Sequence, residues 1–197
     1  EGSISDISSD NTTNKYHKLF ADESECQSFV RRPAWSPDGS LLVVPAGIHR
    51  ESPTSLYNFV AYGFTRDNLK SPAFFLPGFK SCTVCVRFCP YLFMLSKENK
   101  NEFISLPYKM VFAVASRESV LVYTTESYIP ICAANNIHSA SMTDLAWCND
   151  KSLIISSSDG FCSVIKFEPK QFGERYDINL LPEKMRHLFD KYDSINI

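Results

Sequence analysis

The sequence lacks the long apolar run that a membrane-spanning helix needs, and no signal-peptide pattern opens it. It also lacks a basic tail, because its longest run of positive residues is Arg31-Arg32. The formal net charge of −2 on 197 residues leaves no excess of the positive charge that binds nucleic-acid backbones. We therefore expect a soluble protein with no membrane partner and no direct, sequence-specific contact with nucleic acid.

The cysteines do not form the even set that is typical of small secreted disulfide scaffolds. There are seven of them, and several lie within alternating apolar stretches. This pattern predicts reduced thiols in an intracellular compartment. Because the first residue is Glu1 rather than Met, we also expect the chain to be a piece of a longer protein.

Sequence motifs of common enzyme classes are missing as well. The chain has no Gly-x-Ser-x-Gly nucleophile elbow, no phosphate loop and no dinucleotide fingerprint. No two of the four histidines lie at a metal-ligand spacing, namely His17, His49, His138 and His187. We predict that the protein is not an enzyme and has no catalytic residues, although a Ser-His-Asp set assembled in space stays open.

One cysteine pattern, Cys82-x-x-Cys85-x-x-x-Cys89, is similar to zinc and iron–sulfur spacings. Cys82 and Cys85 should point to opposite faces of an alternating strand, and no fourth Cys or His stands nearby. Buried strand thiols are therefore favoured, and we predict no metal site and no cofactor. A metal or redox protein that uses these three thiols is the alternative from a different functional class.

Most of the chain has the texture of an all-β domain. Residues 1–15 form a Ser-rich, acidic stretch with little to bury, which predicts a disordered linker. From 16 to 168, short apolar or alternating runs are separated by turn residues. The predicted strands are Phe29–Trp35, Leu41–Val44, Leu56–Phe64, Val84–Phe88, Lys109–Ala115, Ser119–Tyr123, Asp144–Trp147, Leu153–Ser157 and Cys162–Phe167.

An internal repeat indicates what kind of all-β domain this is. Residues Ala34–Val43 and Ala146–Ile155 share an aromatic residue, a turn containing Asp, and a Ser-Leu-aliphatic strand start. A weaker copy consists of Val86–Pro90 and Lys109–Ala115, interrupted by an insertion at Pro90–Pro107. The aromatic anchors are 53 and 59 residues apart, and they are Trp35, Phe88 and Trp147. WD-repeat blades of about 40–45 residues with added loops fit this spacing.

The third copy carries the polar residues with which WD repeats tie a blade together. His138, Ser157 and Asp159 are predicted to form this structural hydrogen-bond set. Its usual Trp is replaced by Phe167, which cannot donate a hydrogen bond, so we expect a weaker tether in this blade. Three blades cannot close a ring, because propellers need about four to eight. The remaining blades should come from another part of the protein.

Three segments outside the repeat are candidate partner-binding surfaces, namely the insertion at Pro90–Pro107, an acidic cluster near residue 22 and the tail. Residues 169–197 form a tail in which an amphipathic helix is predicted over 182–192. Packing of this helix against its own propeller is the alternative, and the acidic cluster near residue 22 has solvated surface as its alternative. The candidate residues are Asp22, Glu23 and Glu25 in the acidic cluster, and Leu181, Met185, Leu188 and Tyr192 on the helix.

Several segments together resemble one family, the WD-repeat subunit of chromatin assembly factor 1, in a fungal-type version. The resemblance covers about residues 16–168. It is carried by Tyr16–Phe20, Ser28–Arg32, Trp35–Leu42, the Val-Pro-Ala-Gly segment Val44–Gly47, the Leu-Pro-Tyr segment Ser105–Ser116, Asn136–His138, Asp144–Trp147 and Ser157–Ser163.

The resemblance implies that these are the last three blades of a ring of about seven. It implies a nuclear scaffold subunit of a histone chaperone complex, which deposits newly made histones three and four on replicated DNA. The implied partners are a large acidic subunit, a second WD-repeat subunit and these histones. A short basic motif for another histone chaperone is not found after Pro169, so that contact stays open. The alternative is a scaffold of a replication-independent histone chaperone or of another nuclear complex.

Overall fold

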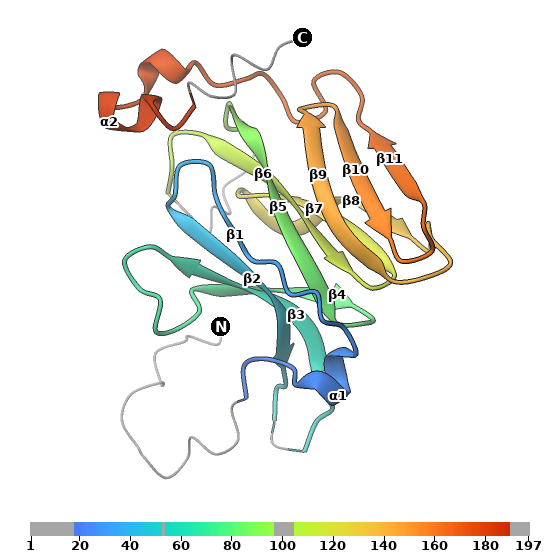
Figure 1. The fold of residues 1–197 in the computed structure, drawn as a ribbon. Helices are drawn as coiled ribbons and strands as arrows, with labels where there is room; N and C mark the ends of the chain where they lie inside the picture. Colours follow the sequence, from blue (N-terminus) through green and yellow to red (C-terminus); the bar gives the residue numbers. More distant parts are fainter. Residues whose placement is uncertain (1–17, 53, 97–104, 190–197) are drawn as a thin grey trace.

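The computed structural model describes residues 18–52, 54–96 and 105–189 and contains three antiparallel sheets (Figure 1). In each sheet, strands that follow one another in sequence are hydrogen-bonded neighbours, as in propeller blades. The first blade contains β1 (Ala34–Trp35), β2 (Leu41–His49), β3 (Asn58–Thr65) and β4 (Phe74–Phe79). The second contains β5 (Thr83–Phe93), β6 (Lys109–Ser116), β7 (Ser119–Thr124) and β8 (Ser127–Asn135). The third contains β9 (Met142–Asn149), β10 (Ser152–Ser157) and β11 (Cys162–Lys166).

The second blade packs between the other two, and this explains its nearly continuous apolar strands. All eight residues of β6 are buried. Alternate side chains point to opposite faces of a strand, so Phe112 and Val114 join a core with the first blade, while Val111 and Ala113 join a core with the third. The prediction of blades from a WD-repeat propeller is confirmed by this face-to-face arrangement.

The repeated sequence forms the same corner in each blade. The predicted anchors Trp35, Phe88 and Trp147 lie on β1, β5 and β9, each the first strand of its blade. Between β1 and β2, Gly39 has a φ of 71°, and its N–H donates to the Ser36 carbonyl at 2.8 Å. This left-handed backbone is the one for which the Asp-Gly turn was predicted.

Two strands were missed by the sequence analysis, and one predicted strand is shorter. The missed strands are β4 and β8, the outer strands of the first and second blades. The predicted strand Phe29–Trp35 is confined to Ala34–Trp35, and the Phe29 side chain is 98% exposed. Arg32 instead makes an isolated parallel bridge to Cys85, which joins the first blade to the second.

The insertion begins later than predicted. Pro90 lies inside β5, which continues to Phe93 with a register shift between Phe88 and Leu92. A bulge of this kind accommodates a proline, since proline cannot donate a ladder hydrogen bond. The connection to β6 therefore consists of residues 94–108, of which 97–104 lie outside the described residues.

The tail returns along the second blade. Arg175 makes an antiparallel bridge to Phe93, and the Tyr176 N–H donates to the Leu92 carbonyl at 2.9 Å. A 3₁₀ helix η1 (Ile178–Leu180) and a short helix α2 (Glu183–Arg186) follow, while α1 (Glu23–Cys26) precedes the first blade. Among residues 18–52, 54–96 and 105–189, no helix is long and apolar enough to cross a membrane.

Candidate interaction surfaces

The predicted hydrogen-bond set of the third blade is assembled around Asp159. The Nδ1 atom of His138 lies 3.1 Å from Asp159 Oδ2, and the Asp159 N–H donates to Ser157 Oγ at 3.3 Å. The Ser157 hydroxyl itself lies 3.2 Å from the Ala140 and Ser141 carbonyls, to which it can donate. The structure thus brings together the three residues that the repeat pattern singled out.

Asp159 carries its charge in this set. Burial raises the pKa of its carboxyl, but hydrogen bonds from the Phe161 and Ser139 N–H groups and from His138 outweigh burial and lower the pKa to about 2. A charged acceptor strengthens each of these bonds. The set therefore ties the loop before β9 to the turn between β10 and β11.

Two features of the structure accompany the replacement of the usual Trp by Phe167. The Nε2 atom of His138 is buried and has no hydrogen-bond partner among the described residues. Phe167 stacks on Trp147 with ring centroids 5.5 Å apart, and Phe172 of the tail contacts both rings. Where WD repeats place a hydrogen-bonding Trp, this blade has an apolar contact with the tail.

The acidic cluster is occupied by contacts within the chain. Asp22 caps α1 by accepting hydrogen bonds from the Ser24 and Glu25 N–H groups, and Glu25 accepts from the Asp22 N–H. Lys18 pairs with Asp22 at 2.7 Å and with Glu25 at 2.8 Å. The hydrogen bond from Lys18, followed by that from Ser24, lowers the pKa of Asp22. Of the three predicted carboxylates, Glu23 alone has no partner in the described part of the chain.

The tail residues are divided between core and surface. Leu181 and Phe189 are buried in the core shared by the first two blades, and Met185 packs against it. Leu188 is 47% exposed, and Tyr192 lies outside the described residues. Helix α2 covers only Glu183–Arg186 of the predicted 182–192, within the part that is described. The structure thus packs this side of the tail against its own propeller.

The three cysteines with metal-like spacing belong to two different clusters. Cys82 packs with Ala46 and Ile48, whereas Cys85 and Cys89 lie in the core between the second and third blades. Burial raises the pKa of Cys85 and of Cys89 to about 12, which keeps both as neutral thiols. No group of three or more potential metal ligands occurs among the described residues.

A buried ion pair that the sequence analysis missed anchors the insertion. Lys109 lies 3.0 Å from Glu126, and their side chains are only 7% and 4% exposed. Ser96 completes the network, since its N–H and hydroxyl donate to the two Glu126 oxygens and its oxygen accepts from Lys109. Burial raises the pKa of Glu126, but these hydrogen bonds outweigh it and the net pKa is lowered. The sequence does contain one sign of this pair, because a charged lysine at the start of the apolar run Lys109–Ala115 needs a buried partner.

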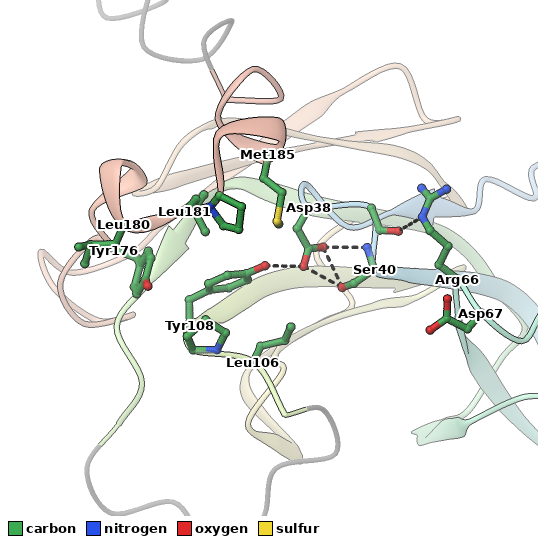
Figure 2. Close-up of a pocket in the computed structure, with 13 residues that line it drawn as sticks. Asp38, Ser40, Arg66, Asp67, Leu106, Tyr108, Tyr176, Leu180, Leu181 and Met185 are labelled. Atoms are coloured by element: carbon green, nitrogen blue, oxygen red, sulfur yellow. Dashed lines mark hydrogen bonds between the residues drawn. The ribbon is translucent and has the colours of Figure 1, made fainter.

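A cavity of about 460 Å³ opens where four segments outside the blade strands meet (Figure 2). The β1–β2 and β3–β4 turns form one side, the end of the insertion forms the floor, and the tail forms the other side. The lining residues are Asp38, Gly39, Ser40, Arg66, Asp67, Leu106, Pro107, Tyr108, Tyr176, Leu180, Leu181, Pro182 and Met185. Its size is that of a site for a few side chains or a small ligand.

The third blade, the last of the three, has exposed apolar side chains beside its outer strand. Its outer strand is β11, and the described residues contain no fourth strand beside it. Val164 on β11 is 53% exposed and Phe161 before it is 72% exposed. Unpaired strand edges with exposed apolar side chains are typical of surfaces that another strand or blade covers.

Comparison with known proteins identifies relatives that match all three blades. A family model described as the CAF1B/HIR1 beta-propeller domain matches residues 2–172. The chromatin assembly factor 1 subunit FAS2 homolog of Oryza sativa is 46% identical over 162 residues, which are 82% of this chain and 32% of that protein. A chromatin assembly factor 1 subunit of Schizosaccharomyces pombe is 42% identical over 177 residues, 85% of this chain and 34% of that protein. Protein HIR1 of Candida albicans is 28% identical over 165 residues, 83% of this chain and 17% of that protein. The chain thus spans about a third of the length of the first two of these relatives.

Proposed function

The chain belongs to the CAF1B/HIR1 β-propeller family, and from that membership we propose that it is part of the WD-repeat scaffold subunit of a histone chaperone complex. The complex would deposit newly made histones three and four onto replicated DNA. The observation that carries the proposal is the much higher identity to chromatin assembly factor 1 subunits than to HIR1 over similar lengths of the chain. A replication-independent chaperone scaffold, as the HIR1 similarity suggests, is the second candidate.

The physical role of such a scaffold is to hold partners in fixed positions. Three blades that share continuous cores form a rigid body, and the turns and insertions around it are the parts free to differ. No covalent chemistry is required for this role, so we propose a function without enzymatic activity. The partners would be the large acidic subunit, the second WD-repeat subunit and histones three and four, in the nucleus.

Completion of the ring is part of the proposal. The exposed apolar groups Phe161 and Val164 at the third blade support burial by a further blade or strand of the full-length protein. The predicted partner contacts at Asp22, Glu23, Glu25, Leu181, Met185, Leu188 and Tyr192 remain proposals. Glu23 and Leu188 are favoured among them, because Asp22 and Glu25 pair with Lys18 and Leu181 and Met185 pack against the propeller core.

Affinity purification of the full-length protein from dividing cells, with mass spectrometry of bound proteins, tests the function. We expect the large acidic subunit, the second WD-repeat subunit and histones three and four in comparable amounts. A matched purification of a HIR1-type protein from the same cells is the control. Recovery of the HIR1 partner set with this protein would overturn the replication-coupled role and favour the second candidate.

A further inference from the structure

We propose that the cavity between the tail and the first blade binds a lysine or arginine side chain from a basic segment of a partner protein. The naming of that partner as a histone rests on the proposed function, whereas the choice of a long cationic side chain rests on the cavity itself. Figure 2 shows its two ends, with Tyr176, Leu180 and Leu181 at one and Arg66 and Asp67 at the other.

The apolar end suits the methylene chain of such a residue. Tyr108 and Tyr176 contact each other edge to face with ring centroids 5.4 Å apart, and both line the cavity. Leu106 and Met185 extend this lining from the insertion and from α2. Lysine and arginine bury their aliphatic stems against such surfaces and leave the charged end to reach a polar group beyond them.

The carboxylate of Asp38 belongs to the wall of the cavity and is already saturated. It accepts hydrogen bonds from the hydroxyls of Ser36, Ser40 and Tyr108 and from the Ser40 N–H. Four donors occupy the lone pairs that a carboxylate offers. Asp38 therefore gives the wall a fixed negative charge but does not need a ligand.

Asp67 is the carboxylate that is available to a ligand. It is exposed, lines the cavity, and has no hydrogen bond or ion pair within the described part of the chain. The neighbouring Arg66 also lines the cavity, but its contacts are with groups other than Asp67, because its Nε donates to the Gly39 carbonyl at 2.6 Å and its guanidinium lies over Trp35 at 4.5 Å. Two carboxylates and one guanidinium give the lining a net negative charge, which favours a cationic guest over an anionic or purely apolar one.

The test uses the full-length protein and a fluorescein-labelled peptide of the histone H4 tail, with binding followed by anisotropy at physiological salt. Asp67→Lys should weaken binding about tenfold, because an exposed ion pair is lost and a repulsion of similar size is added. Met185→Trp, which fills the cavity without changing charge, should weaken binding by at least as much. Glu51→Lys is the matched control, since Glu51 is an exposed acid beyond the opposite end of β2, and it should bind like the wild type.

A second peptide, with every Lys and Arg replaced by Gln, separates a cationic guest from an apolar one. Equal binding of this peptide, wild-type affinity of the Asp67→Lys protein, or no binding of the H4 peptide by the wild type would each overturn the inference. Retention of intact histones three and four by the reconstituted complex is measured in parallel. If the wild-type complex retains them while the cavity variants bind the peptide normally, only this inference falls. If the wild-type complex retains no histones, the proposed function falls.

Discussion

The Glu126→Ala substitution should lower the free energy of unfolding by about 3–5 kcal/mol, a large effect for one residue outside any active site. It removes the counter-charge of Lys109 while that ammonium stays buried at 7% exposure. It also removes the acceptor of the Ser96 N–H and hydroxyl, which fix the start of the insertion. Loss of hydrogen bonds to a charged group contributes about 1.5–3 kcal/mol to this total.

The double variant Lys109→Met/Glu126→Leu separates an unpaired buried charge from a general disturbance of packing. Apolar residues of similar size replace both charges, so no desolvated ion is left without a partner. Such replacements of buried pairs are often neutral or stabilising. We therefore expect the double variant to recover most of the stability that Glu126→Ala loses.

Urea denaturation of the full-length protein measures the stabilities, and hydrogen exchange of β6 amides localises the change. Lys170→Ala is the control, because Lys170 and Glu174 form an ion pair at 3.4 Å with side chains 76% and 75% exposed. Such an exposed pair contributes at most about 1 kcal/mol. Equal destabilisation by the single and the double variant would refute the reasoning, since the loss would then not come from the unpaired Lys109.

Three further outcomes follow from single sites. Gly63→Ala should cost about 1–3 kcal/mol in urea denaturation, because the new Cβ would lie 2.1 Å from Phe74 Cζ. Asp159 has a folded-state pKa lowered to about 2, so its stabilising contribution is complete above about pH 4 and is lost between pH 4 and 2. The stability difference between the wild type and Asp159→Asn should accordingly lose most of its size over that interval. Iodoacetamide should alkylate the exposed Cys148 in the folded protein, while mass spectrometry finds the four buried thiols modified only after unfolding.

The inner part of each blade could be predicted from the sequence because its contacts are local. The β9–β10 hairpin joins residues only a few positions apart, and the aromatic and turn residues that specify it recur in two clear copies. His138 and Asp159 are 21 residues apart within one blade, so their contact follows once the repeat is identified. Repeat proteins allow this inference because each unit reproduces the same short-range arrangement.

The outer strands could not be predicted in the same way. Strand β4 contains Pro77-Gly78, and β8 contains Pro130, which are residues that indicate turns or strand ends elsewhere. Each of these strands is an edge of its sheet, where a proline costs no ladder hydrogen bond, and the burial pattern of β4 is also irregular. The prolines and the glycine that an edge strand tolerates therefore also make such a strand look like a turn in the sequence.

The cavity could not be predicted from the sequence either. Each segment that lines it can be recognised in the sequence, but their proximity in space cannot. The turn at Asp38, the insertion end at Tyr108 and the tail at Met185 are 70 and 77 residues apart along the chain. The repeat specifies the Asp38 turn and its neighbours within one blade, but it does not constrain the insertion or the tail. Only the docking of the tail, through Leu181 and Phe189 in the core, determines that α2 stands over the first blade. Residues outside a repeat are free to acquire specific contacts without disturbing the blades, so the place where the insertion and the tail converge on a blade turn is where recognition in a propeller scaffold is most easily built.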